Sequence, residues 1–66
     1  MSDAPRYGVR IERDDEGWRA VITGPDGEEA LERRFEAEDE AQLFASTVEQ
    51  HLGWLSVARF REYYRL

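Results

Sequence analysis

The chain has 66 residues, of which fifteen are acidic and nine are basic, and its formal net charge is −6. A chain of this length forms one domain with a small core, because it buries only about 60% of the surface that its unfolded form exposes. It has no cysteine, which excludes a disulfide framework and a thiolate zinc site. The negative charge disfavours direct binding to nucleic acid, since basic side chains bind phosphates.

The sequence also disfavours a membrane or secreted location. No segment approaches the roughly 20 apolar residues that cross a bilayer, and the N-terminal residues have no apolar signal-peptide core. We therefore expect a cytoplasmic protein without a membrane partner. We interpret residues 1–66 as a single domain in which residues 1–6 form a flexible N-terminal tail.

Two segments have the period of two that is typical of half-buried strands. Apolar side chains alternate with polar or small ones at residues 7–12 and again at residues 18–23. The intervening "DDEG" predicts a turn, so the two strands form a hairpin. A second turn follows in "GPDGEE", where Pro25 presets the backbone and Gly27 can adopt a positive φ.

A third strand is expected after this turn. Leu31 and Phe35 would face the core, and Glu32, Arg34 and Glu36 would face outward. Arg33 would then point inward, and an inward charge on an edge strand protects that edge from pairing.

Helix signals begin at Asp39, which forms a possible capping box with Gln42. An apolar stripe at helical spacing follows: Ala41, Phe44, Ala45, Val48 and Leu52. Gly53 fits the position just after a helix, and Ser56 fits the cap of a short second helix. We predict an α+β fold, a three-stranded antiparallel meander packed by one main helix and a short C-terminal helix. The large side chains available for its core are Tyr7, Trp18, Phe35, Phe44, Trp54 and Phe60.

Charge is distributed unevenly along the chain. Residues 12–40 contain twelve acids and four arginines, a net charge of −8, whereas the other residues have a net charge of +2. In a meander, the first turn, the end of the third strand and the start of the helix lie at the same end of the sheet. The carboxylates of residues 14–16 and 38–40 should therefore converge. The second turn should lie about 20 Å away, with Glu12 and other acids on the outer face between them.

This acidic row is the candidate partner-binding surface. Its residues are Asp14, Asp15, Glu16, Asp26, Glu28, Glu29, Glu32, Glu36, Glu38, Asp39 and Glu40. Two charges 10 Å apart in water repel by only about 0.4 kcal/mol, so a fold tolerates the crowding. The summed field can steer a basic partner toward the surface. The alternative is that the acids only keep the protein soluble.

The residues offer little for catalysis or for binding a metal or cofactor. His51 is the only histidine, and no serine or threonine has a neighbouring base to activate it. "DDEG" lacks the spacing of an EF-hand loop, and there is no phosphate-binding glycine loop. The basic and aromatic residues 59–65 are expected to pack on the sheet and pair with acids. We therefore expect no enzyme, no cofactor and no metal.

Three family resemblances accompany this interpretation. The hairpin "VRIERDDEGWRAVI", with a third strand and a helix, resembles the start of the HicB antitoxins, acidic proteins that mask a small RNA-binding toxin. The resemblance covers residues 7 to about 52. The family's proline-glycine signature appears only as "GPDGEE", and its usual final strand has no counterpart.

The strands and "FEAEDEA" are also similar to the arm-type DNA-binding domains of phage integrases. Those domains are basic where this chain is acidic, so that resemblance implies the fold without DNA binding.

The size, acidity and lack of catalytic residues resemble in type the small phage-encoded anti-CRISPR proteins that imitate DNA. This resemblance implies a non-enzymatic inhibitor in the cytoplasm of a host bacterium. Its partner would be a basic nucleic-acid-binding protein, such as the subunit of a type I CRISPR complex that holds target DNA. The alternative is an antitoxin-like module that masks a small basic toxin through Val21, Tyr63, Tyr64 and Leu66. The chain is expected to be a monomer or a homodimer.

Overall fold

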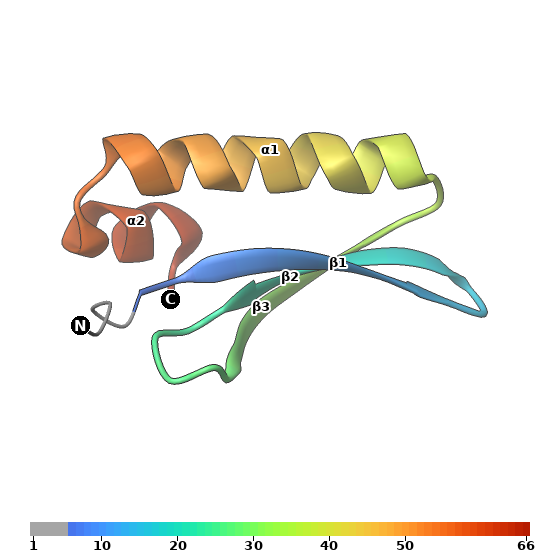
Figure 1. The fold of residues 1–66 in the computed structure, drawn as a ribbon, viewed down its shortest axis with the longest axis horizontal. Coiled ribbons are helices and arrows are strands. Elements are labelled where there is room, and N and C mark those ends of the chain that lie inside the picture. The colour runs from blue at the N-terminus through green and yellow to red at the C-terminus, as the bar shows by residue number, and fades with distance from the viewer. Residues whose placement is uncertain (1–5) are drawn as a thin grey trace, which may run out of the picture.

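A computed structural model describes residues 6–66 of the chain. Its elements are β1 (Gly8–Asp14), β2 (Gly17–Thr23), β3 (Glu29–Phe35), α1 (Glu38–Trp54) and α2 (Val57–Tyr64). The strands form an antiparallel sheet in the order β1-β2-β3, α1 runs along one face, and α2 turns back beneath the end of α1 (Figure 1). The predicted α+β fold is confirmed. Most of the predicted tail, residues 1–5, lies outside the described residues.

The strand register assigns side chains to two faces of the sheet. Val9 lies opposite Ile22, which lies opposite Leu31, and all three belong to the core beneath the helices. Side chains alternate along a strand, so the neighbouring row centred on Val21 points to the outer face, away from the helices. The predicted alternation of all three strands is therefore confirmed.

The core lies between the sheet and the two helices. Its fully buried centre consists of Ile22, Val48 and Phe60. Partly buried residues pack around this centre: Tyr7, Val9, Leu31, Phe44, Leu52, Leu55, Tyr64 and Leu66. The Tyr7 and Phe60 rings are 5.2 Å apart, which joins the start of β1 to α2. The predicted apolar stripe of α1 faces this core, where its three smallest members are buried.

The second turn has the predicted positive φ at Gly27, and the first turn adds an unpredicted one at Gly17. Gly27 has a φ of 86°, which suits glycine and closes the β2–β3 connection. Gly17 has a φ of 140°, and a Cβ atom there would lie 2.7 Å from the carbonyl oxygen of Phe35. A larger residue at position 17 would therefore push the first hairpin away from the end of β3.

Both ends of α1 differ from the prediction. The helix begins at Glu38 after an Ala37 N-cap that makes no side-chain hydrogen bond, so the capping box at Asp39 is absent. The Asp39 carboxylate accepts a 3.0 Å bond from the next backbone N–H instead. The helix also continues through Gly53, which lacks a positive φ in this structure, and its cap is the extended residue Leu55. The predicted stop at Gly53 is therefore wrong.

Trp54 and Ser56 show how the helix junction forms. Trp54 is 77% exposed and is not a core residue, because it lies two residues after Leu52 and so on the opposite side of α1. Ser56 caps α2 by accepting a 3.2 Å hydrogen bond from the backbone N–H of Arg59, as predicted. Arg65 ends that helix in a left-handed conformation with a φ of 58°.

Candidate functional site

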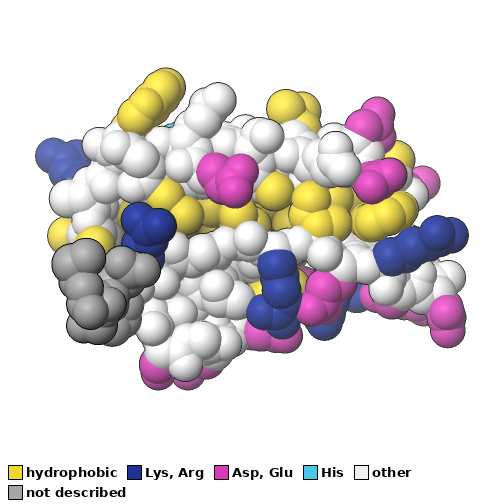
Figure 2. Space-filling model, viewed as in Figure 1, with side chains coloured by type: hydrophobic (Ala, Val, Ile, Leu, Met, Phe, Trp, Pro, Cys, Tyr) yellow, Lys and Arg dark blue, Asp and Glu magenta, His cyan; other side chains and the backbone are white. Residues whose placement is uncertain are grey.

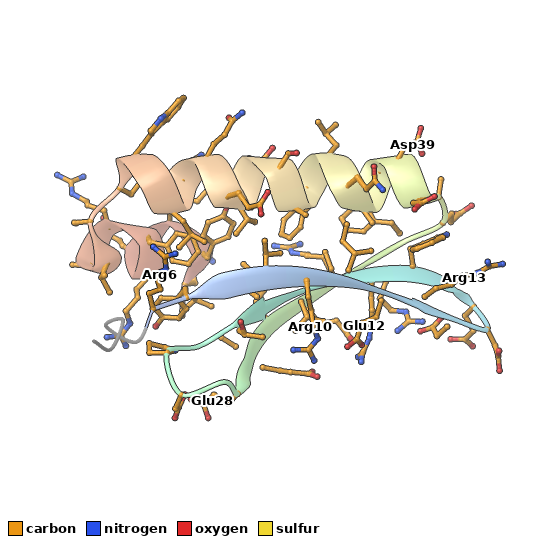
Figure 3. The ribbon with its side chains drawn as sticks, viewed as in Figure 1. Arg6, Arg10, Glu12, Arg13, Glu28 and Asp39 are labelled. Carbon is orange, nitrogen blue, oxygen red and sulfur yellow. The ribbon has the colours of Figure 1, made fainter. Side chains whose placement is uncertain are left out.

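The outer face of the sheet carries a network of ion pairs across all three strands. We define the outer-face network as Arg10, Glu12, Asp14, Glu16, Arg19, Glu29, Glu32 and Arg34. Arg10 binds Glu12 at 2.6 Å and reaches across the sheet to Glu29 at 2.9 Å. Arg19 binds both Glu12 and Glu32 from the central strand. Figure 3 shows Arg10 and Glu12 projecting from β1 away from the helices.

This network changes the predicted row of negative charge. Glu12 and Glu32 lie on the outer face as expected, but each bonds to an arginine. The sequence analysis placed Arg34 on the outer side of the third strand, but it did not predict that arginines would pair with these carboxylates. Alternating charge at outward positions of paired strands was the available signal, since opposite charges on neighbouring strands attract.

The aliphatic parts of the network cover Val21. This residue points to the outer face yet is fully buried, in a row between Arg10 and Glu32. Long charged side chains can cover apolar surface while their charged groups stay in water. Val21 is therefore shielded from solvent without a further layer of structure.

The arginines also perturb the acid–base chemistry of the surface. Hydrogen bonds from Arg10 and then Arg19 hold the pKa of Glu12 below its ordinary value. A hydrogen bond from Arg34, together with the backbone N–H of Glu16, lowers the pKa of Asp14. These two carboxylates therefore stay ionised to a lower pH than free ones.

A second group of carboxylates converges at one end of the molecule, as predicted. The first hairpin turn contacts the end of β3, because a Cβ on Gly17 would lie 3.8 Å from the Cα of Glu36. The chain enters α1 two residues later, above that turn (Figure 1). We define the acidic end as seven carboxylates with two arginines: Asp14, Asp15, Glu16, Glu36, Glu38, Asp39, Glu40, Arg13 and Arg34. Figure 2 shows acidic side chains at this right-hand end, on both layers of the molecule.

Most carboxylates of the acidic end are exposed and without an internal counter-charge. Among residues 6–66, ion pairs at this end involve Arg34 with Asp14 at 2.6 Å and with Glu16 at 3.5 Å. Arg13 lies 5.6 Å from the ring of Trp18. The acidic end has a net charge of −5, which equals the net charge of residues 6–66 as a whole. The remainder of the described molecule is thus neutral.

The carboxylates of the second turn do not join this group. Glu29 belongs to the outer-face network, whereas Asp26 and Glu28 are exposed at the opposite end of the sheet. Asp26 and Glu28 line a shallow depression with Arg61 from α2. A basic side chain therefore lies beside the acids of this turn, and the predicted row is broken into separate groups.

The residues of the alternative, antitoxin-like surface are dispersed. Tyr64 and Leu66 pack against the core, and Val21 is covered, which leaves Tyr63 as the exposed member at 63%. Tyr64 also bonds to His51, with 2.7 Å between its hydroxyl and Nδ1. His51 thus joins α1 to α2, and Tyr63 lies against it with ring centroids 4.6 Å apart. Arg59, Arg61 and Arg65 make no ion pair within residues 6–66, in contrast to the prediction.

Within the described part of the chain, no group of three or more His, Cys, Asp or Glu side chains is arranged to hold a metal ion. Neither helix of residues 6–66 is long and apolar enough to span a membrane. No protein-family model, no curated protein and no solved structure matched the chain when it was compared with them. The choice of a functional surface therefore depends on charge and geometry.

Proposed function

We propose that this protein is a non-enzymatic inhibitor whose acidic end imitates the phosphates of DNA. It would occupy the nucleic-acid-binding site of a bacterial defence complex, with a type I CRISPR surveillance complex as the specific candidate. The observation that supports the proposal is the concentration of net charge, because the acidic end carries −5 and the rest of residues 6–66 is neutral.

The arrangement suits the task in two ways. The carboxylates stand on the first hairpin and the start of α1, so the backbone holds their attachment points side by side before a partner arrives. A field concentrated at one end also orients the molecule as it approaches a basic cleft, which raises the association rate. Asp15, Glu38, Asp39 and Glu40 are available for arginine and lysine side chains of the partner, whereas the outer-face carboxylates already have arginine partners.

The favourable effect of acids at a helix N-terminus accounts for part of this cluster without any partner. Glu38, Asp39 and Glu40 occupy the first turn of α1, where the helix dipole stabilises negative charge. This effect gives no account of Asp15 in the hairpin turn or of Glu36 at the end of β3. The experiment must therefore separate binding from helix stability.

The test is competition with labelled target DNA for a purified type I surveillance complex, followed by fluorescence anisotropy. We expect the protein to displace the DNA, and we expect the displacement to weaken as salt rises. The acidic-end variant Glu38→Gln/Asp39→Asn/Glu40→Gln should lose at least about tenfold in apparent affinity, which corresponds to about 1.4 kcal/mol.

The matched control removes the same number of charges elsewhere, as Asp26→Asn/Glu28→Gln/Glu62→Gln. It should stay within about twofold of the unmodified protein, and circular dichroism should show both variants folded. Failure of the protein to displace DNA, or an equal loss in the two variants, would contradict the proposal.

A further inference from the structure

We propose that the outer edge of β1 pairs with β1 of a second copy of this chain. The result would be a symmetric dimer with one continuous six-stranded sheet. This inference does not depend on the proposed function or on the partner of the acidic end.

The first observation is that β1 has an unpaired edge. It lies at one side of the sheet, and no segment of residues 6–66 pairs with its outer side. The first hairpin has a two-residue turn flanked by the pair Asp14 and Gly17, which is therefore a hydrogen-bonded pair. Bonded and non-bonded pairs alternate in an antiparallel ladder. The backbone N–H and C=O groups of Val9, Ile11 and Arg13 consequently point outward.

The second observation is that β1 complements itself in charge. A two-fold axis at Ile11 pairs all seven residues of the strand and places Arg10 opposite Glu12 of the second copy. By symmetry, Glu12 of the first copy lies opposite Arg10 of the second copy. It pairs Ile11 with itself through outward backbone groups, and it places no like charges opposite each other.

The neighbouring registers fail on charge. An axis at Arg10 places that arginine opposite itself, and an axis at Glu12 does the same for that glutamate. An axis at Arg13 combines an arginine pair with a Glu12–Asp14 pair. Like charges directly opposite each other destabilise a sheet. The self-complementary register is thus also the one with the most paired residues.

The third observation is a groove on the helix side of the same edge. It has a volume of about 520 Å³, and its walls include Val9 from β1, Glu49 and Leu52 from α1, and Phe60 from α2. In the proposed register, Arg13 of the second copy lies opposite Val9 and so beside this groove. Glu49, which makes no ion pair within residues 6–66, is placed to receive that arginine.

The other edge of the sheet lacks these properties. β3 has a register irregularity against β2 at Ile22 and Thr23, and its helix-side row contains Arg33. Bulges and inward-facing charges are features that keep an edge strand unpaired. Because β3 has both of these features and β1 does not, we expect association through β1 alone. Association through one edge gives a closed dimer, whereas association through both edges would be open-ended.

The test uses two charge variants. Each should fail to form a homodimer, but the two should form a heterodimer with each other. Arg10→Glu places two glutamates opposite Glu12 residues in the homodimer, and Glu12→Arg places arginines opposite Arg10 residues. In a mixture, one chain presents two glutamates and the other two arginines, so both cross-strand pairs become attractive. Sedimentation velocity and native mass spectrometry over a range of concentrations would measure all four samples.

We expect a dimer for the unmodified chain and a dissociation constant at least about tenfold higher for each single variant. We expect a heterodimer to return when the variants are mixed, which misfolded chains would not produce. A monomer at the highest concentration of the unmodified chain would overturn the proposal. So would single variants that dimerise as tightly as the unmodified chain, or a mixture that stays monomeric.

Discussion

At the scale of the residue, the carboxylates fall into two groups, those paired with an arginine and those without one. Asp14 and Asp15 are adjacent in the sequence, yet Asp14 bonds to Arg34 and Asp15 makes no ion pair within residues 6–66. Glu12 is a component of the outer-face network, whereas Glu36 at the end of β3 has no arginine partner in that part of the chain. Paired carboxylates hold the sheet surface together, and unpaired ones are available to a partner.

The pKa values of individual carboxylates test this division. The variant Arg34→Gln should raise the pKa of Asp14 toward its ordinary value and leave Glu12 unchanged, because Arg34 is the main cause of the Asp14 shift. The variant Arg10→Gln should do the reverse, since Arg10 is the main cause for Glu12. NMR titration of the side-chain carboxyl signals would measure both. If both variants moved both residues equally, the shifts would reflect the general field and not the specific bonds.

The same lowered pKa values predict the response of stability to acid. In the unfolded chain Glu12 and Asp14 take up protons near their ordinary values of 4.5 and 3.8, whereas in the fold they do so only at lower pH. At a pH between the folded and unfolded pKa values, the unfolded state binds more protons than the fold. The two carboxylates therefore contribute their full stabilisation above the ordinary pKa values, and this stabilisation is lost as pH falls. The free energy of unfolding in urea should therefore decrease below about pH 4.5. A curve that stayed flat down to pH 3 would contradict this expectation.

The core tolerates little loss of volume. Phe60 is 1% exposed and belongs to the buried centre. Phe60→Ala should cost about 3–5 kcal/mol, a large part of the total stability expected for a chain of this size. The control Trp54→Ala removes a larger ring that is 77% exposed and should change stability by less than about 0.5 kcal/mol. Urea denaturation would measure both, and equal costs would show that Trp54 packs in solution.

At the scale of the element, the two helices begin differently. α2 has a Ser56 cap that bonds to its first turn, whereas α1 starts after Ala37 with no side-chain bond. The acids in the first turn of α1 supply a favourable charge at that end instead. Gly53 near the end of α1 supplies no special conformation, and a Cβ there would have no neighbour within 4 Å.

Removing the cap of α2 and adding a cap to α1 should therefore change stability in opposite directions. Ser56→Ala should destabilise the fold by about 1 kcal/mol through the loss of its bond to the Arg59 N–H. Ala37→Ser should stabilise it by about 0.5–1 kcal/mol, since Ala37 already has the extended conformation of an N-cap. Thermal unfolding would measure both changes. A loss of stability in Ala37→Ser would show that the half-buried methyl group of Ala37 matters more than a cap.

At the scale of the whole molecule, the net negative charge is concentrated at one end. The acidic end lies at one end of the 37 Å long axis, and the remainder of residues 6–66 has no net charge. The proposed dimer would place two acidic ends at opposite ends of one six-stranded sheet, because its two-fold axis passes through the middle of β1. Each copy would then present its own acidic end.

An oligoarginine peptide is a suitable probe of this distribution. The amide signals of residues 14–16 and 36–40 should shift most in an NMR titration, because the net negative charge of residues 6–66 is concentrated there. The shifts should shrink as salt rises, since exposed charges are screened. Larger shifts along the middle of the outer face would show that the network opens to bind cations.

The sequence alone determined the elements of the fold and the end at which acids converge. The alternation of residues 18–23 and the stripe from Ala41 to Leu52 depend on local periods, and the turns depend on Gly17 and Gly27. Antiparallel order then fixes which turn lies beside the start of α1. These features follow from short-range geometry, which a single sequence contains.

Only the tertiary structure decided which carboxylates are paired and where α1 ends. Arg19 is seven residues from Glu12 and thirteen from Glu32, and only the strand register brings the three together. α1 likewise continues through Gly53, on either side of which Leu52 and Leu55 pack against the core, and it leaves Trp54 exposed. Contacts between distant segments have no local period, which is why the sequence did not reveal them.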